Sequence, residues 1–310
     1  MAVLVPCYNE EIAIAKVVRD FRAALPEAAI YVYDNNSSDN TVAVAMAAGA
    51  VVRRETNQGK GNVVRRMFAD IDADVYVLVD GDATYDAASA GAMVGRLIDD
   101  GLDMLVAQRI DQEEAAYRLG HRAGNRLLSG FTANAFGRSV SDMLSGYRVF
   151  SRRFVKSFPV LSGGFEIETE LTVHALELGL PAGEMPTPYY ARPQGSVSKL
   201  NTWRDGLRIL RTIVKLYRSE RPLRFFSGLG ISLAVMSVGL AIPLVLTYLR
   251  EGLVPRLPTA ILSTGLMLSA LLAVACGLIL DTVTRARREV KLLAYLNQRP
   301  PGADWDRRQG

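Results

Sequence analysis

The chain has 310 residues, which is enough for one large α/β domain and a smaller second part. Its two cysteines cannot build a disulfide framework, so a reduced, cytosolic environment is expected for the polar part. The formal net charge is only +4, but arginine and lysine are dense in residues 192–224, which favours an anionic membrane surface or phosphate-bearing substrates over nucleic acid.

The first third of the chain alternates short β-rich runs with helical patterns. Strands are expected at residues 2–5, 29–33, 50–52, 75–79 and 103–107. Helices are expected between them, at residues 11–25, 41–48, 61–71 and 87–99. Alternation of this kind predicts an α/β fold with a doubly wound, mostly parallel sheet.

Polar side chains follow three of these strands at the point where each strand ends. They are Asn9-Glu10, Asp34 and Asp80-Gly81-Asp82. Ligands of such sheets bind at the carboxyl ends of the strands, so these groups are expected to converge on one edge. Asp80 and Asp82 could share a hard divalent cation, Mg²⁺ or Mn²⁺, that also holds a diphosphate, and a solvated turn is the simpler alternative.

Two further stretches suggest a nucleotide site. Asp34 could accept hydrogen bonds from a nucleobase or ribose, while Ser38 or Asp39 could cap the next helix. The stretch "NQGKGN" at residues 57–62 offers glycines for close approach and Lys60 for a base or phosphate. The sequence contains neither a P-loop nor a G-x-G-x-x-G after a strand, which argues against an NTPase and a dinucleotide oxidoreductase.

The two histidines, His121 and His174, have no partner motif and are interpreted as structural.

The second half of the chain changes character. Residues 113–136 are predicted to be helical, and residues 202–220 predict a basic amphipathic helix suited to a membrane interface. Residues 225–249 and 259–280 are long enough, and apolar enough, to span a bilayer. Basic residues precede the first span and follow the second: Arg218, Arg221, Arg224, Arg285, Arg287, Arg288 and Lys291. This distribution predicts a hairpin with both ends in the cytoplasm.

Seven stretches occur in an order and at a spacing that resemble a known family. They are "VLVPCYNEE", "VYDNNSSDNT", "NQGKGN", "VLVDGDATYD", "DMLSGYRVFSRR", "GGFEIETEL" and "QGSVSK". They look like the inverting family 2 glycosyltransferases, in the branch of dolichol-phosphate mannose synthase and bacterial polyprenyl-phosphate glycosyltransferases. The resemblance covers about residues 2–220 and implies a Rossmann-like GT-A fold. The expected division is a GT-A domain (1–200), a juxtamembrane amphipathic helix (201–222), a two-helix transmembrane hairpin (223–284) and a basic cytoplasmic tail (285–310).

The resemblance also implies roles for individual residues on the donor side. The candidates for nucleotide binding are Pro6, Tyr8, Glu10, Asp34, Lys60, Asp80 and Arg109. Asp80 and Asp82 become the metal and diphosphate ligands, and Asp82 also counts as catalytic. Thr84 stands where family members often have Gln or a similar residue, which weakens the case for a third protein ligand.

On the acceptor side, Asp142 and Arg148 are placed near the sugar as catalytic or orienting groups. Glu166 and Glu168 are expected to organise the acceptor, or else simply to pair with nearby arginines. The candidates for the acceptor phosphate are Arg118 or Arg122, together with Arg192, Ser196, Ser198 and Lys199.

The implied reaction moves a sugar from a nucleotide diphosphate sugar to a polyprenyl phosphate with inversion, using Mg²⁺ or Mn²⁺. A UDP-sugar is favoured and GDP-mannose is possible. The expected location is the cytoplasmic (inner) membrane, with a multi-pass anchor, the catalytic domain facing the cytoplasm and no nucleic-acid partner; a homo-oligomer is compatible with the sequence. The amino terminus has no basic leader, so no signal peptide is expected. Two alternatives are a processive polysaccharide synthase, although the Q-x-x-R-W motif and further spans of that class are missing, and a non-catalytic membrane adaptor with a nucleotide-sugar fold.

Overall fold

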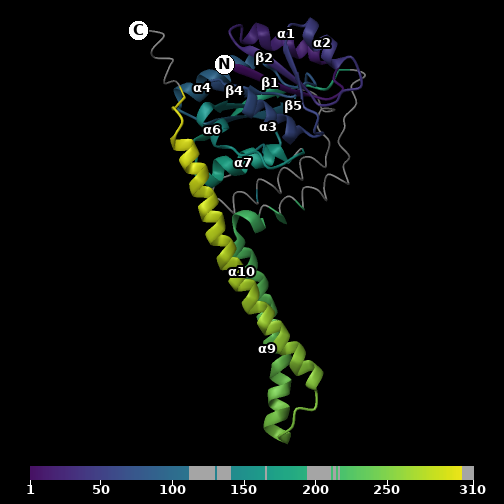
Figure 1. Cartoon of the computed structure of the whole chain (residues 1–310), viewed down its shortest axis with the longest axis vertical. Helices are drawn as coiled ribbons and strands as arrows, with labels where there is room; N and C mark the ends of the chain where they lie inside the picture. The colour runs from purple at the N-terminus through teal and green to yellow at the C-terminus, as the bar shows by residue number, and fades with distance from the viewer. Residues whose placement is uncertain are drawn as a thin grey trace. The chain divides into compact units, whose positions relative to one another are not determined.

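The computed structural model of the chain describes residues 1–111, 130, 141–164, 166–193, 211, 214–215 and 217–301. It has two compact units, one of residues 1–209 with 290–310 and one of residues 210–289, and each is described by itself. The first unit contains a mixed α/β sheet, and the second contains two long apolar helices (Figure 1).

The described strands of the first unit form one sheet in the order β3-β2-β1-β4-β6-β5-β7. The strands are β1 (Ala2–Cys7), β2 (Ala29–Asp34), β3 (Val51–Arg54), β4 (Val75–Leu78), β5 (Met104–Asp111), β6 (Arg148–Ser151) and β7 (Ala182–Tyr189). All neighbouring pairs are parallel except those of β6, which lies antiparallel between β4 and β5. The prediction of a mostly parallel α/β sheet is therefore confirmed.

All five predicted strands are present, and two more were missed. β5 continues to Asp111 instead of ending at residue 107. β6 and β7 lie in the part of the chain, residues 108–200, that the sequence pattern left irregular. The four residues of β6 are all buried, so no alternation of apolar and polar side chains marks it as a strand.

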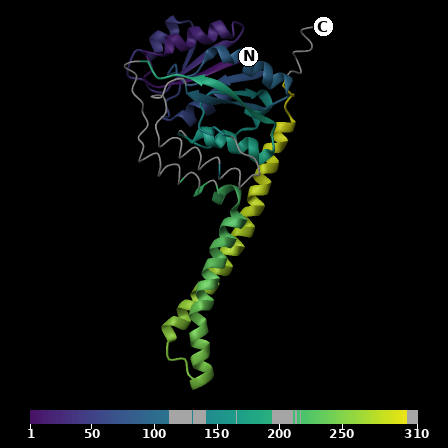
Figure 2. The same ribbon diagram turned by 180° about the vertical axis from the view of Figure 1, so that it is seen from behind.

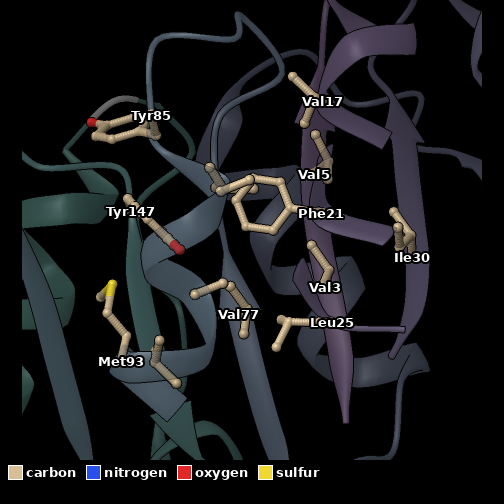
Figure 3. Packing of buried hydrophobic residues seen from close by; sticks show 14 of the residues in the cluster. Val3, Val5, Val17, Phe21, Leu25, Ile30, Val77, Tyr85, Met93 and Tyr147 are labelled. Atoms are coloured by element: carbon tan, nitrogen blue, oxygen red, sulfur yellow. The ribbon is translucent and has the colours of Figure 1, made fainter. Parts of the chain in front are cut away.

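Helices cover both faces of the sheet (Figures 1 and 2). They are α1 (Ile14–Ala24), α2 (Thr41–Ala47), α3 (Lys60–Asp70), α4 (Ala90–Asp99, preceded by a short 3₁₀ turn at Ala87–Ser89), α6 (Arg152–Ser157) and α7 (Ile167–Leu178). Val3 and Val5 of β1 pack with Phe21 of α1 on one face, where Phe21 meets Tyr147 edge to face at 5.7 Å between ring centroids (Figure 3).

The opposite face is an aromatic core. Phe68 of α3 lies 6.2 Å from Tyr76 of β4 and 5.9 Å from Phe150 of β6, measured between ring centroids. Phe154 of α6 stacks on Phe150 at 4.7 Å. The two cores hold the strand ends in place from both sides, and the site described below lies at the carboxyl ends of β1, β2 and β4.

His174 of α7 is buried beside this aromatic core. Its ring lies 5.2 Å from that of Phe154 and 5.1 Å from that of Phe158, and its Nε2 shares a 3.1 Å hydrogen bond with Ser157 Oγ. Burial, together with the charge of Lys291, lowers the pKa of His174 from about 6.5 to about 3. These contacts agree with the structural role that the sequence suggests for this histidine; His121 lies outside the described residues.

The buried His174 predicts acid sensitivity. The unfolded imidazole binds a proton as the pH falls below about 6.5, whereas the folded one does so only near 3, so protons favour the unfolded chain in this window. The free energy of unfolding should therefore fall by about 2 kcal/mol between pH 7 and pH 5. Denaturant unfolding of the wild type and of His174→Phe at the two pH values checks this. The variant should lose this part of the pH dependence, and an equal loss of stability in both proteins would contradict the account.

The second unit is a helical hairpin of α9 (Pro222–Glu251) and the part of α10 (Leu257–Leu296) that precedes residue 290, and the two helices lie side by side in both views (Figures 1 and 2). Ser237 Oγ donates to Ser263 O at 2.7 Å, and Ser263 Oγ donates back to Ser237 O at 3.0 Å. A Cβ on Gly230 would lie 2.9 Å from Ala270 O, so a glycine permits this close approach. By length and composition both helices could cross a membrane.

The predicted spans 225–249 and 259–280 lie within α9 and α10. The amphipathic helix expected at 201–222 falls largely outside the described residues. Residues 285–296 of the expected basic tail form the end of α10, and residues 290–310 group with the first unit. Within the first unit, Lys291 Nζ donates to Glu177 Oε2 at 2.7 Å, and Tyr295 OH donates to Asp103 Oδ2 at 2.8 Å.

Candidate active site

Two carboxylates follow β4 in the turn Asp80-Gly81-Asp82. Asp82 is nearly buried, and its Oδ1 accepts hydrogen bonds from the Thr84 backbone N–H at 3.2 Å and from Thr84 Oγ1 at 2.6 Å. A Cβ on Gly81 would lie 2.6 Å from Cys7 Sγ, so glycine lets the turn approach the end of β1. Burial and the neighbouring Asp80 charge raise the pKa of Asp82. The turn therefore favours a bound positive charge.

Lys60, the first residue of α3, joins this turn to α7. Its Nζ lies 2.5 Å from Asp80 Oδ1 and 2.5 Å from Glu168 Oε1. Burial opposes the charged form, but the two carboxylates outweigh it and raise the pKa of Lys60 above its usual value. Lys60 thus connects the predicted metal-binding turn with Glu168, which was predicted to lie on the acceptor side. The closest cationic partner of Glu168 is this lysine, and the charge of Glu168 also acts on Arg148.

The two glycines that flank Lys60 allow its backbone to pack closely on the loop before α7. Gly59 has a φ of +128°, and a Cβ on it would lie 2.1 Å from Gly163 O. A Cβ on Gly61 would lie 2.1 Å from Ser162 O, and the Gly61 N–H donates to Gly164 O at 3.2 Å. The backbone of "NQGKGN" therefore packs directly on the loop before α7. The close approach predicted for these glycines is made to the chain's own backbone.

Arg109 and Asp142 form a two-pronged ion pair. Arg109 Nε and Nη2 each lie 2.7 Å from an Asp142 oxygen, and the Arg109 backbone N–H donates to the same carboxylate at 3.3 Å. Glu184 Oε1 accepts hydrogen bonds from the backbone N–H groups of Ser141 and Asp142 at 2.7 and 3.1 Å. The structure thus brings together a predicted phosphate-binding arginine and a predicted catalytic carboxylate.

Arg148 was predicted to lie near the sugar, but its side chain is completely buried in the domain. Its guanidinium donates to Ser145 O at 2.9 Å, Met143 O at 2.7 Å and Thr172 Oγ1 at 2.8 Å. Burial lowers the pKa of Arg148 to about 10. These contacts identify Arg148 as a residue that supports the loop after Asp142, and not as a group that meets substrate.

Replacing Arg148 by Met should therefore destabilise the domain. We expect the free energy of unfolding to fall by about 2–4 kcal/mol, because two backbone carbonyls lose buried donors. Arg66→Met, which removes an exposed arginine of α3 paired with Asp70, should change stability by about 0.5 kcal/mol or less. Denaturant unfolding of the three proteins checks the difference. Unchanged stability with lost activity in Arg148→Met would instead support a direct catalytic role.

The predicted nucleotide residues lie at the ends of β1 and β2. Asp34 is fully buried and accepts from the Ser37 N–H at 3.2 Å, with Arg54 Nε at 3.5 Å. Glu10 is nearly buried, and its N–H donates to Thr41 Oγ1 at 2.8 Å. Pro6 is the fifth residue of β1, and Tyr8, just beyond it, is exposed.

Asn35 was missed by the sequence reasoning. Its amide donates to Glu55 O and Asn57 O, both at 2.8 Å, and its carbonyl accepts from the Gly59 N–H at 2.7 Å. It therefore ties the loops after β2 and β3 to the start of α3. An asparagine after a strand reads as an ordinary turn residue, and its partners are backbone groups, so no side-chain pattern signals this role.

Arg192 was predicted to bind the acceptor phosphate, yet it contacts the donor-side carboxylates. Its Nη2 lies 2.6 Å from Asp82 Oδ2, and its Nη1 lies 3.6 Å from Glu10 Oε1.

Glu166 is half-buried just before α7. The remaining acceptor candidates, Arg118, Arg122, Ser196, Ser198 and Lys199, lie outside the described residues.

The turn after β4 fits a hard divalent cation. Asp80 and Asp82 each already hold a cationic side chain, Lys60 or Arg192. Within the described residues, no group of three or more His, Cys, Asp or Glu side chains is placed to bind a metal. A cation held by this carboxylate pair would complete its coordination with water and substrate phosphate, as Mg²⁺ commonly does.

Comparison with known proteins identifies the family. The description "Glycosyl transferase family 2" matches residues 2–158. Glycosyltransferase AglJ of Haloferax volcanii is 32% identical over 291 residues, covering 93% of this chain and 95% of AglJ. The chain therefore belongs to glycosyltransferase family 2.

Two further proteins are similar to this chain, one in sequence and one in fold. A dolichyl-phosphate hexose transferase of Haloferax volcanii is 29% identical over 221 residues, covering 71% of this chain and 95% of the relative. The structure of glucosyl-3-phosphoglycerate synthase from Mycobacterium tuberculosis, bound to Mn²⁺, UDP and phosphoglyceric acid, matches with a TM-score of 0.56 and 23% identity, covering 70% of this chain and 76% of that one. The structural likeness confirms the GT-A fold.

Proposed function

We propose that this chain transfers a sugar from a nucleotide diphosphate sugar to a polyprenyl phosphate with inversion at the anomeric carbon. The observation that carries the proposal is the Asp80-Gly81-Asp82 turn at the carboxyl edge of the sheet, in a chain that also has two helices of membrane-spanning length. The similarity to a dolichyl-phosphate hexose transferase supports a lipid phosphate as the acceptor. A UDP-sugar is the favoured donor.

The donor side is proposed to hold the nucleotide at the ends of β1, β2 and β4. Asp34 and Glu10 would contact the nucleoside, and Asp80 and Asp82 would hold Mg²⁺ or Mn²⁺ beside the diphosphate. A divalent cation bound there neutralises negative charge that develops on the leaving diphosphate. The bond between the anomeric carbon and the diphosphate oxygen breaks as an acceptor phosphate oxygen forms its bond to the opposite face of that carbon.

The acceptor needs little activation. A phosphate monoester has a second pKa near 6, so it is largely dianionic at neutral pH and is already a competent nucleophile.

Lys60 and Glu168 are then best understood as groups that hold the donor and acceptor sides at a constant separation. Arg118 or Arg122, with Ser196, Ser198 and Lys199, are proposed to bind the lipid phosphate, and Asp142 is proposed to orient Arg109 towards phosphate charge.

The hairpin is proposed to anchor the enzyme in the cytoplasmic membrane with the catalytic unit on the cytoplasmic side. Arg221 and Arg224 lie at the start of α9, and Arg285, Arg287 and Arg288 lie beyond the apolar part of α10. Basic residues at both ends favour retention of both ends on the cytoplasmic face. A membrane anchor would keep the enzyme at the bilayer that carries a lipid phosphate acceptor.

A donor screen tests this proposal. The purified full chain in detergent is incubated with a short polyprenyl phosphate, Mn²⁺ and one of several donors (UDP-glucose, UDP-N-acetylglucosamine, a UDP-uronic acid or GDP-mannose). Mass spectrometry follows the lipid, and a coupled assay follows the nucleoside diphosphate. We expect one donor to yield a lipid-linked sugar and an equal amount of nucleoside diphosphate. If donors are cleaved to nucleoside diphosphate but no donor yields a glycosylated lipid, the proposed acceptor is wrong.

A further inference from the structure

The position of Arg192 follows from backbone pairing between two distant segments. Tyr85 and Tyr189 form an antiparallel bridge, and the N–H of the residue after Tyr189 donates to Thr84 O at 2.9 Å. Arg192 lies two residues beyond this hydrogen bond, and its Nη2 reaches Asp82 Oδ2 at 2.6 Å. The segment that follows β7 is in this way connected to the turn that follows β4.

Arg192 forms an ion pair with Asp82, a carboxylate that the metal would need as a ligand. Asp82 Oδ2 lies 2.6 Å from Arg192, while Oδ1 accepts the two hydrogen bonds from Thr84, so both oxygens of Asp82 are engaged. Arg192 also lies 3.6 Å from Glu10 Oε1. Its side chain keeps 29% exposure against 7% for Asp82, which places the cation on the solvent side of the buried carboxylate, where it can be displaced.

We propose that Arg192 is a donor-side residue that serves as the counter-ion of Asp82 in the nucleotide-free protein and moves onto the donor diphosphate when the nucleotide and the divalent cation bind. A guanidinium pairs well with phosphate oxygens, and the carboxylate that it leaves is a hard oxygen ligand for Mg²⁺ or Mn²⁺. Metal binding without nucleotide must break the ion pair between Arg192 and Asp82, whereas a bound diphosphate offers the guanidinium new oxygen partners. Tight metal binding therefore requires the nucleotide. This inference rests on the proposed use of a nucleotide diphosphate donor.

Direct measurement of Mn²⁺ binding tests the inference without any turnover. The detergent-solubilised full chain is titrated with Mn²⁺, and the free ion is followed by electron paramagnetic resonance, with and without UDP. In the absence of UDP, Arg192→Gln should bind Mn²⁺ roughly tenfold more tightly than the wild type, because the competing cation is gone. UDP should tighten Mn²⁺ binding to the wild type by a larger factor than it does for the variant.

Matched variants separate the ion pair from a general effect of charge. Arg66→Gln removes the same charge from an exposed pair with Asp70 and should leave Mn²⁺ affinity unchanged. Arg192→Lys keeps a cation at this position and should restore the weak binding of the wild type. Equal Mn²⁺ affinity of the wild type and Arg192→Gln without UDP would overturn the inference. Failure of sugar transfer to lipid, with the Mn²⁺ difference intact, would overturn only the proposed acceptor.

Discussion

Replacement of Asp82 by Asn should lower kcat/KM for sugar transfer by about two to three orders of magnitude. The amide removes the negative charge that, with Asp80, is proposed to hold the divalent cation beside the diphosphate. The same change should leave the free energy of unfolding within about 1 kcal/mol of the wild type, because an amide oxygen can still accept the Thr84 hydrogen bonds and Arg192 keeps Glu10 beside it. Transfer assays and denaturant unfolding of the same preparation check both parts.

The matched control is Asp100→Asn at the end of α4, where the carboxylate pairs with Arg96 on the exposed surface. This variant should retain full activity. If Asp82→Asn kept more than about one tenth of the wild-type rate, the turn after β4 would not be the diphosphate site that the mechanism requires.

The second large effect is expected from a residue that touches no substrate in this account. A Cβ on Gly146 would lie 2.4 Å from Asp80 Oδ2 and 2.9 Å from its Cγ, so Gly146→Ala must displace the Asp80 carboxylate, which also pairs with Lys60. The moving atoms are the end of a side chain, so the fold can accommodate the methyl group. We expect transfer activity to fall by about ten- to a hundredfold, with little change in stability, because small displacements at a reacting centre are costly.

Gly95→Ala provides the comparison for this variant. Gly95 lies in α4, and beyond its chain neighbours and the adjoining helix backbone no heavy atom is within 4 Å of the position of an added Cβ. An alanine there should preserve activity and raise stability by about 0.5–1 kcal/mol through its better helix propensity. A Gly146→Ala enzyme as active as Gly95→Ala would show that the position of Asp80 does not limit the reaction.

The parts of the fold that the sequence predicts correctly depend on local patterns. β1, β2 and β4 are short apolar runs between amphipathic helices, and their carboxyl ends converge because the strands are parallel neighbours. The grouping of Glu10, Asp34 and Asp80 at one edge follows from that topology alone. β6 could not be placed in the same way, because a strand inserted antiparallel between two others depends on packing that no local pattern records.

The sequence reasoning was least accurate where a role depends on contacts between distant segments. "SGYR" suggests an arginine near substrate, but three buried acceptors hold Arg148 inside the domain. Arg192 stands beside a stretch predicted to bind a lipid phosphate, and only the pairing of residues 84–85 with 189–190 brings it to Asp82. A register between segments about a hundred residues apart is invisible to motif spacing.

The identity of the acceptor tests the central claim most directly. The full chain, in detergent and with the productive donor and Mn²⁺, is offered a polyprenyl phosphate, 3-phosphoglycerate or no acceptor, and the glycosylated products are quantified by mass spectrometry. We expect a product with the lipid phosphate alone, and loss of that product in Asp82→Asn. Transfer to 3-phosphoglycerate with none to the lipid, or a rate of donor cleavage that no acceptor changes, would contradict it.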